Sequence, residues 1–310
     1  MPYDLGKYQR IRVEPLTGSI GAEIFGIDVA RVDEPTFAEI QQAFHEHAVI
    51  FFRDQELDAR CLGTFASRFA PLTAAYGKAR EGDDLVGRLH RPAEVPSSIR
   101  DLGDRWHADK GSSEEPNMGV ALYCLEAPPY GGDTLFANLC AAYAALSPAL
   151  KTICEPLIAL HSPPVERRSV ARYGAYSDNR PLQGSAKSLS GDGSAEAGGQ
   201  TRVCVEHPLV CTHPDTGRPI LYVTGDHMVG IKGMSELEAR PLLDLLHNYA
   251  VRPEFTCRFR WRKGSLAVWD NRCAQHYAAN DYAGFARTML RAEMEGTRPI
   301  GPATLASQRL

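Results

Sequence analysis

The chain lacks any apolar run long enough to cross a membrane. None of its 310 residues belongs to a stretch approaching about 18 consecutive apolar residues. The N-terminal segment MPYDLGKYQR also lacks the apolar centre that a secretory signal needs. We therefore expect a cytoplasmic protein with no membrane partner.

Basic clusters and paired cysteines are missing as well. No run of Lys and Arg marks a nucleic-acid footprint, and the formal net charge is −4, so we expect no nucleic-acid partner. The cysteines are scattered without a CxxC pair, which predicts reduced, mostly buried thiols instead of a disulfide framework or a zinc-thiolate site. There are eight of them: Cys61, Cys124, Cys140, Cys154, Cys204, Cys211, Cys257 and Cys273.

The composition is otherwise that of a globular protein with a real core. Hydrophobic residues make up 44% of the chain and charged residues 23%. The length allows one large domain or two small ones. Candidate catalytic residues lie on both sides of the Gly/Ser/Ala-rich segment 184–200, so we predict a single domain, 1–310, with a flexible insertion there. The long polar segment 71–104 is predicted to be a lid.

Short strand-like runs separated by turns predict a sandwich or a jelly roll with helices on the outside. Apolar periodicity predicts helices at 34–47, 57–69, 138–151 and 235–250. The expected strands are 48–52, 119–125, 134–137, 209–212, 220–224, 255–261, 265–270 and 287–295.

Two imidazoles and one carboxylate form the most informative pattern. On a strand, side chains two residues apart face the same side, so His107 and Asp109 can reach one ion while the small Ala108 points away. His276 supplies a second imidazole from far downstream. This is the ligand set of a non-haem Fe(II) oxygenase, which leaves the opposite metal positions open. For His-x-Asp alone, a surface pair in a polar loop is the better interpretation. A zinc hydrolase uses similar ligands, but no general base stands at the expected spacing.

Two arginines follow the distal histidine. Arg287, Met289 and Arg291 share one face of the last expected strand, because side chains alternate. Buried arginines require anionic partners, and a guanidinium matches a carboxylate or sulfonate. The alternative is that both pair with protein carboxylates such as Glu293 or Asp281.

In combination, these motifs resemble the taurine/alpha-ketoglutarate dioxygenase (TauD/TfdA) family from about residue 10 to 296. The resemblance rests on Pro15-Leu-Thr-Gly-x-x-Gly-Ala-Glu23, Trp106-His-Ala-Asp109, Gly131-Gly-Asp-Thr-Leu135, Thr212-His-Pro-x-x-Gly217, Trp269-Asp-Asn-Arg-x-x-Gln-His276 and Arg287-x-x-x-Arg291. It implies a mostly β protein whose core is a double-stranded β-helix of the jelly-roll, cupin-like type, with flanking helices.

The resemblance also implies the roles of single residues. His107, Asp109 and His276 match the Fe(II) ligands, with no further catalytic residue beyond this metal centre. Thr134 and Arg287 match the residues that bind the co-substrate 2-oxoglutarate. The resemblance also implies O2 as a co-substrate and a small-molecule substrate. Arg291 matches a position that binds this substrate.

The implied reaction is hydroxylation of a small organic anion, with succinate and CO2 as co-products. A sulfonate, a sulfate ester or an aryloxyalkanoate would fit, and hydroxylation beside a heteroatom would cleave the bond. Halogenating relatives replace the carboxylate at Asp109, so its presence favours hydroxylation. The same chemistry on a larger or neutral metabolite, or on a protein, stays open, as does a non-catalytic metal-binding barrel. We expect a homo-oligomer.

The segment 72–104, where members build their substrate pockets, shows no match. His90 lies in it and is a candidate substrate-binding residue, with a solvated loop histidine as the alternative. We interpret His207 and His213 as structural, and Cys273 as a packing residue. His227 follows the end of an expected strand and is placed at the border of the cavity.

Overall fold

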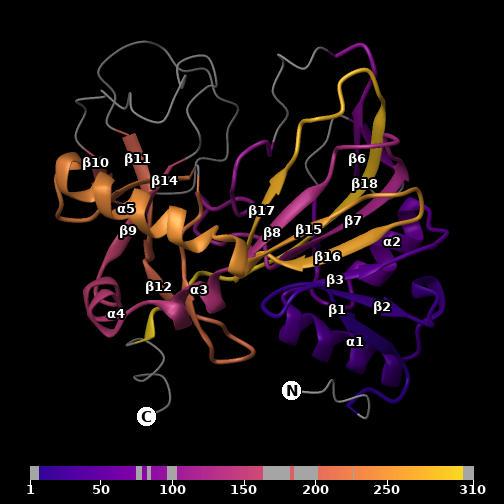
Figure 1. Cartoon of the computed structure of the whole chain (residues 1–310), viewed down its shortest axis with the longest axis horizontal. Helices are drawn as coiled ribbons and strands as arrows, with labels where there is room; N and C mark the ends of the chain where they lie inside the picture. The colour runs from indigo at the N-terminus through magenta and orange to yellow at the C-terminus, as the bar shows by residue number, and fades with distance from the viewer. Residues whose placement is uncertain are drawn as a thin grey trace.

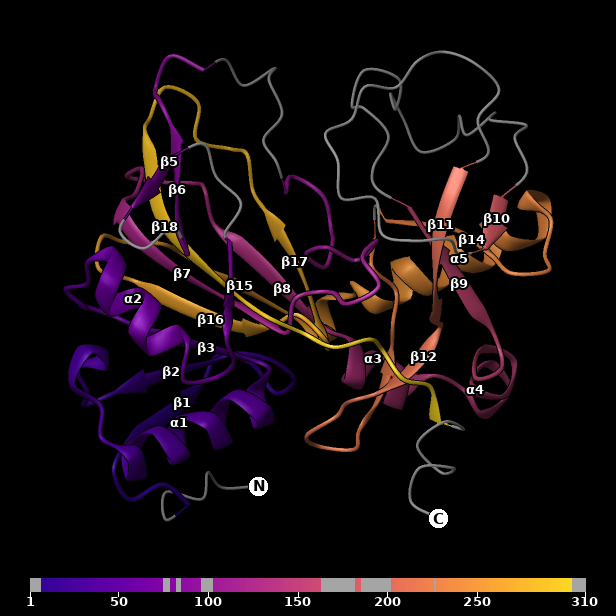
Figure 2. The ribbon, with the colours of Figure 1, turned by 180° about the vertical axis from the view of Figure 1, so that it is seen from behind.

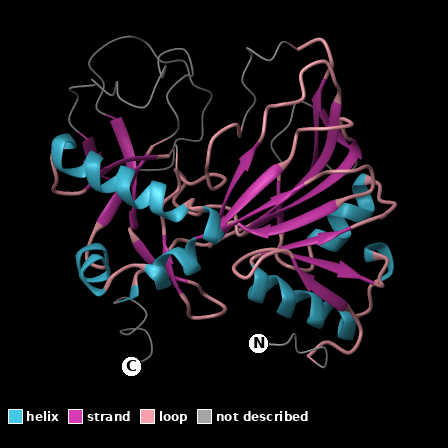
Figure 3. Cartoon of the chain, in the orientation of Figure 1, coloured by secondary structure: helices cyan, strands magenta, loops and turns pink. Residues whose placement is uncertain are grey.

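Strands dominate the structure, and helices lie at its periphery (Figure 3). This computed structural model describes residues 7–74, 79–81, 85–95, 103–162, 182–184, 202–225 and 227–302. The described helices are α1 (Glu34–His47), α2 (Ala59–Ala66), α3 (Leu139–Ala145), α4 (Pro148–Cys154) and α5 (Glu236–Ala250), with 3-10 turns η1 (Val29–Arg31) and η2 (Pro253–Phe255).

The strands form four sheets, and those described do not close into one barrel. The nine-stranded sheet runs β1 (Arg12–Pro15), β2 (Ala22–Phe25), β3 (Val49–Phe52), β16 (Leu266–Asp270), β7 (Gly119–Glu126), β18 (Arg287–Met294), β6 (Val86–Arg91), β5 (Ala79–Glu81), with β4 (Leu72–Thr73) also on β18. The three-stranded sheet is β15 (Thr256–Phe259), β8 (Thr134–Asn138), β17 (Ala274–Ala278). The four-stranded sheet is β10 (Leu182–Gly184), β11 (Arg202–Pro208), β9 (Ile158–His161), β14 (Met228–Ile231), and the last pair is β12 (Val210–Thr212) with β13 (Pro219–Leu221).

The two faces of the nine-stranded sheet bury two separate cores. One face packs on the three-stranded sheet, where Phe51 stacks on Phe259 with ring centroids 4.0 Å apart and Phe136 lies 5.6 Å from Trp269. The other face carries Phe52 and is covered by α1 and α2 (Figure 1). Full burial of one such ring stabilises the fold by about 1.5–3 kcal/mol.

This arrangement confirms the predicted alternation of the last strand. Met289 belongs to the core between the two sheets, whereas Leu290 and Ala292 belong to the core beneath the helices. Arg287 and Arg291 therefore face the space between the nine-stranded and the three-stranded sheet. The four-stranded sheet, α4 and α5 form a separate group beside these two sheets, as the view from behind shows (Figure 2).

Local signals explain most helix limits. Asp33 and Asp58 accept backbone N–H bonds at the starts of α1 and α2, and Ser235 with Glu238 forms the capping box expected for α5. The second helix is shorter than predicted. Leu57 lies before the cap, and turns occupy the residues after Ala66.

Two expectations need correction. The predicted helix 138–151 is two helices, because Ser147 caps a new helix and Pro148 cannot continue the old one. The predicted lid 71–104 contributes β4, β5 and β6 to the nine-stranded sheet, so this part is not a loop; residues 75–78, 82–84 and 96–102 lie outside the described chain. Residues 185–200 of the predicted insertion also lie outside it.

All eight cysteines are free thiols, and seven of them are buried. Within the described ranges, none of the helices has the length and apolarity that a membrane crossing requires.

Candidate metal centre

The three predicted ligands converge beside β17, an edge strand of the three-stranded sheet. His107 and His276 exchange both backbone hydrogen bonds, at 3.0 and 2.9 Å, so their side chains lie on the same face. Their ring centroids are 4.1 Å apart. Donor atoms of these two rings and of Asp109 all lie within 4.8 Å of one another.

One ring nitrogen of His107 is fixed by the backbone. Its Nδ1 lies 2.8 Å from the carbonyl oxygen of Arg105, which can only accept, so Nδ1 carries the proton. The lone pair is then on Nε2, which points toward Asp109 at 3.8 Å from Oδ1. Metal-binding histidines are commonly oriented in this way.

The two carboxylate oxygens of Asp109 have different surroundings. Oδ1 accepts an ion-paired bond of 2.8 Å from Nη2 of Arg291. Oδ2 lies 3.6 Å from Nε2 of His276, is buried and has no hydrogen-bond partner. A buried anionic oxygen without a partner is costly. A divalent cation between Oδ2 and the two imidazoles satisfies it, so the residues present fit Fe(II).

The protonation states also suit a metal. Burial opposes ionisation of Asp109, but the Arg291 guanidinium holds the pKa of this carboxyl well below its usual range. Burial, and then the neighbouring His107, lower the pKa of His276 far below the ordinary value. The site therefore presents a carboxylate and a neutral imidazole, the forms that bind metal ions.

Asn271 holds the backbone of the ligand segment. Its Oδ1 accepts from the N–H of Asp109 at 2.7 Å, and its Nδ2 donates to the carbonyl oxygens of Asp109 at 2.9 Å and Asn117 at 3.0 Å. The side chain is 1% exposed. Asn271 belongs to the Trp269–His276 motif, and its position directly after a buried strand is the signal in the sequence for this role.

Thr134 and Arg287 both lie against the side chain of Trp261. The indole Nε1–H of Trp261 donates to Thr134 Oγ1 at 2.9 Å, so the hydroxyl proton is directed elsewhere. The guanidinium carbon of Arg287 lies 5.8 Å from the centre of the Trp261 ring. Thr134 shares its strand face with Phe136, which pairs with His276 in register. The sequence placed Trp261 only at the end of the expected strand 255–261, with no role at the site.

Arg291 is bound to protein carboxylates, which is the alternative that the sequence left open. In addition to Asp109, it donates from Nε to Glu293 Oε1 at 2.9 Å. Glu293 is 1% exposed and also contacts Lys110 Nζ at 3.0 Å and Asn117 Nδ2 at 2.9 Å. Lys110 adopts φ 51°, in the left-handed region that non-glycine residues rarely occupy and that often marks functional sites.

His90 does not belong to this site. It is exposed, and its Nδ1 lies 2.9 Å from Oγ1 of Thr288, its register partner in β18. Thr288 is on the opposite face of the strand from Arg287. Strand alternation thus turns His90 away from Arg287, and its candidate substrate-binding role stays a prediction that this position does not support.

A second group of donor atoms lies nearby, at His213, Asp270 and Cys273. His213 Nε2 bonds Asp270 Oδ2 at 2.9 Å, and Nδ1 accepts from the N–H groups of Asp215 and Thr216 at 3.3 and 3.2 Å. Both nitrogens are thus used within the protein. We assign this group the structural role expected for His213, fixing a turn to the end of β16.

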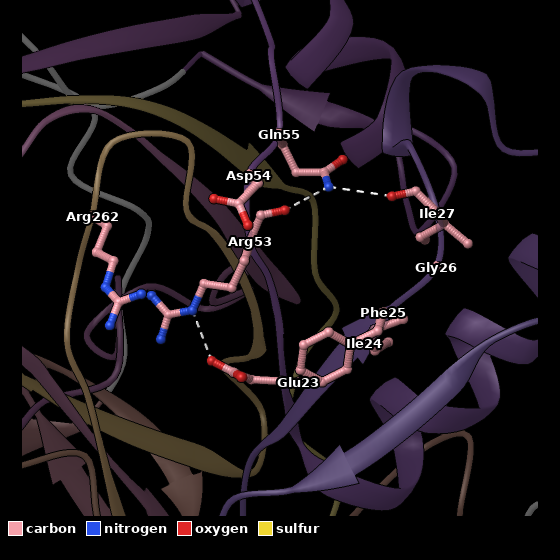
Figure 4. A pocket seen from close by; sticks show the side chains of 9 residues that line it. All are labelled: Glu23, Ile24, Phe25, Gly26, Ile27, Arg53, Asp54, Gln55 and Arg262. Atoms are coloured by element: carbon pink, nitrogen blue, oxygen red, sulfur yellow. Dashed lines mark hydrogen bonds and ion pairs between the residues drawn. The ribbon is translucent and has the colours of Figure 1, made fainter.

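A polar hollow of about 430 Å³ lies between β2 and the turn after β3 (Figure 4). Arg53 donates to Glu23 at 2.7 Å, and Gln55 donates to the carbonyl oxygens of Ile27 and Arg53 at 3.3 and 2.8 Å. No predicted site residue lines it. Its internal hydrogen bonds make it part of the framework instead of a candidate active site.

Known proteins resemble this chain over almost its whole length. The sequence model described as "Taurine catabolism dioxygenase TauD, TfdA family" matches residues 12–292. An alkylsulfatase of Acinetobacter baylyi is 32% identical over 94% of this chain and 87% of its own, and an alpha-ketoglutarate-dependent sulfate ester dioxygenase of Pseudomonas putida is 32% identical over 93% and 91%. The crystal structure of a taurine dioxygenase from Burkholderia xenovorans superposes with a TM-score of 0.76 and 31% identity, covering 95% of this chain and 94% of that one.

Proposed function

Because this chain belongs to the TauD, TfdA family and is an alpha-ketoglutarate-dependent dioxygenase, we propose that it hydroxylates a small organic anion at the centre formed by His107, Asp109 and His276. Fe(II), 2-oxoglutarate and O2 are the cofactor and co-substrates of such an enzyme. The observation that carries the proposal is the convergence of these three side chains around the unpartnered Oδ2 of Asp109.

Bound Fe(II) supplies the oxidising chemistry that couples conversion of 2-oxoglutarate to succinate and CO2 with hydroxylation of the substrate. The protein's part is to hold and orient the reactants. Arg287 offers a guanidinium to the distal carboxylate of 2-oxoglutarate. Thr134 donates its hydroxyl proton to the same carboxylate, because Trp261 already donates to its oxygen.

Charge beside the metal favours an anionic substrate. The negative charge of Asp109 would be neutralised by the bound metal ion. Lys110 and Arg291 then carry two positive charges against one on Glu293, which leaves one positive charge. This balance suits a monoanion such as a sulfate ester, a sulfonate or an aryloxyalkanoate, with Arg291 nearest to the metal.

The proposed fold core is a double-stranded β-helix. The nine-stranded and three-stranded sheets would be its two walls, since they pack face to face through Phe51, Phe136, Phe259 and Trp269. Homo-oligomerisation stays a prediction.

The test is substrate-dependent release of succinate from 2-oxoglutarate. The panel contains an alkyl sulfate, an alkanesulfonate, a phenoxyalkanoate and the neutral primary alcohol matched to each. We expect turnover with at least one anion and none with its alcohol, no turnover in His107→Ala, and loss of the preference for the anion in Arg291→Met. Undiminished succinate production by His107→Ala, or equal turnover of an anion and its alcohol, contradicts the proposal.

A further inference from the structure

The outer face of α5 carries an apolar stripe. Leu237, Pro241 and Leu245 follow one another at intervals of four residues, so they lie on one side of the helix, and all three are exposed. Leu237 is 85% exposed and Leu245 51%, which makes them two of the five large hydrophobic side chains exposed in the described chain. Single exposed leucines are ordinary on a protein surface, whereas a contiguous exposed row is typical of an interaction site.

The core of the protein uses only the opposite face of α5. Ala239 and Leu243 pack with Ile231 of β14, and Leu246 and Ala250 are also buried. The helix lies in front of the four-stranded sheet in Figure 1 and behind it in Figure 2, so its outer face points away from the sheet. Packing inside the described chain thus accounts for the inner apolar side chains of α5 but not for the outer stripe.

The spacing of the stripe fits a second copy of the same helix that runs in the opposite direction. The register is set by a twofold axis level with Leu242. Leu245 of the second copy then lies midway between Leu237 and Pro241 of the first, about 3 Å along the helix from each. The reverse contact forms at the same time, because a twofold interface is self-complementary.

The same axis pairs the charges beside the stripe. Arg240 and Asp244 lie along one edge of it and bond each other at 2.9 Å within the helix, with side chains 40% and 43% exposed. They stand two residues before and two residues after Leu242, so Arg240 of one copy is level with Asp244 of the other. On the other edge, Glu238 is bound by Ser235, and its two copies are about 12 Å apart, where salt largely screens their repulsion.

We propose that α5 is the contact between two copies of this chain, packed antiparallel about an axis level with Leu242. A single register interleaves the apolar stripe and joins opposite charges, which is the property expected of a surface that binds its own copy. The proposal assigns a face to the homo-oligomer that the sequence predicts. It does not involve the metal centre, so it stands or falls separately from the proposed function.

Sedimentation velocity of the full chain over a range of concentrations measures the association. A contact of one helix per copy is at the small end of stable interfaces, so we expect a dimer with a Kd on the order of 10 μM. Leu245→Asp should weaken dimerisation at least about 100-fold, because each dimer contains the position twice and one buried leucine contributes about tenfold or more. Ile153→Asp on α4 is the matched control, since Ile153 is 48% exposed, and it should leave the Kd unchanged.

Charge reversal tests the antiparallel pairing. Arg240→Asp places negative charges opposite each other, and Asp244→Arg does the same with positive charges. Each variant alone should therefore dimerise at least about tenfold more weakly than the wild-type protein. An equimolar mixture of the two variants should recover a Kd within about threefold of the wild-type value, because every contact between positions 240 and 244 again joins opposite charges. Far-UV circular dichroism shows that each variant is folded.

Three results would overturn the proposal. A wild-type monomer at every concentration up to about 300 μM shows that no second copy covers the stripe. An association that Leu245→Asp leaves unchanged, or that Ile153→Asp weakens equally, places the interface elsewhere. Charge variants that stay monomeric when mixed exclude the antiparallel register. None of these results bears on the dioxygenase assignment.

Discussion

Replacement of Asn271 by alanine should destabilise the backbone segment that carries Asp109. The substitution leaves three backbone groups without partners: the N–H and carbonyl of Asp109 and the carbonyl of Asn117. An orphaned buried polar group costs about 1–3 kcal/mol. We therefore expect Asn271→Ala to lower the free energy of unfolding by at least about 3 kcal/mol.

The same change should weaken metal binding about 10- to 100-fold, as is usual when a residue that orients a ligand is lost. Urea denaturation measures the first effect, and titration of the apoprotein with Mn(II) measures the second. Asn248→Ala on the exposed side of α5 is the matched control and should change neither quantity. A loss below about 0.5 kcal/mol with unchanged Mn(II) affinity would refute the role assigned to Asn271.

Three other predictions follow from the site and its surroundings. Arg287→Ala should weaken 2-oxoglutarate binding more than metal binding; a change confined to the affinity for the substrate would show that the co-substrate pocket is misplaced. Burial lowers the pKa of His207 to about 4, so between that value and the ordinary value of about 6.5 the unfolded state binds more protons. Stability should therefore fall as pH drops through this window, by up to about 1.4 kcal/mol per pH unit, and urea midpoints of His207→Gln should depend less on pH. Glu293→Gln removes the charge that compensates Arg291, so competition by sulfate against substrate should strengthen, and unchanged inhibition by sulfate would argue against the charge balance.

The convergence of His107, Asp109 and His276 was predictable from sequence motifs, but the strand expected over 107–109 is absent. His107 forms only isolated β-bridges and Asp109 begins a turn, so alternation does not explain why these two side chains meet. Alternation did predict the shared face of Arg287 and Arg291. Such patterns depend only on the backbone period, which the sequence carries directly.

Features that depend on partners from distant elements were not predictable in the same way. The segment containing His90 reads as a polar loop, yet it pairs with β18 as a sheet strand, and the register turns this histidine away. The binding of Arg291 to Asp109 and Glu293 was one of two open outcomes. The role of Trp261 depends on the pairing of β15 with β8, which sets Phe259 opposite Thr134 and so brings the indole of Trp261 within reach of the Thr134 hydroxyl.

The most direct test of the central claim is optical and anaerobic. Apoprotein is titrated with Fe(II), 2-oxoglutarate is added, and the visible metal-to-ligand charge-transfer band of the chelate is recorded. The band should appear in the wild-type protein and be lost in His107→Ala. Iron binding without any band, or an undiminished band in His107→Ala, would contradict the assignment of this centre.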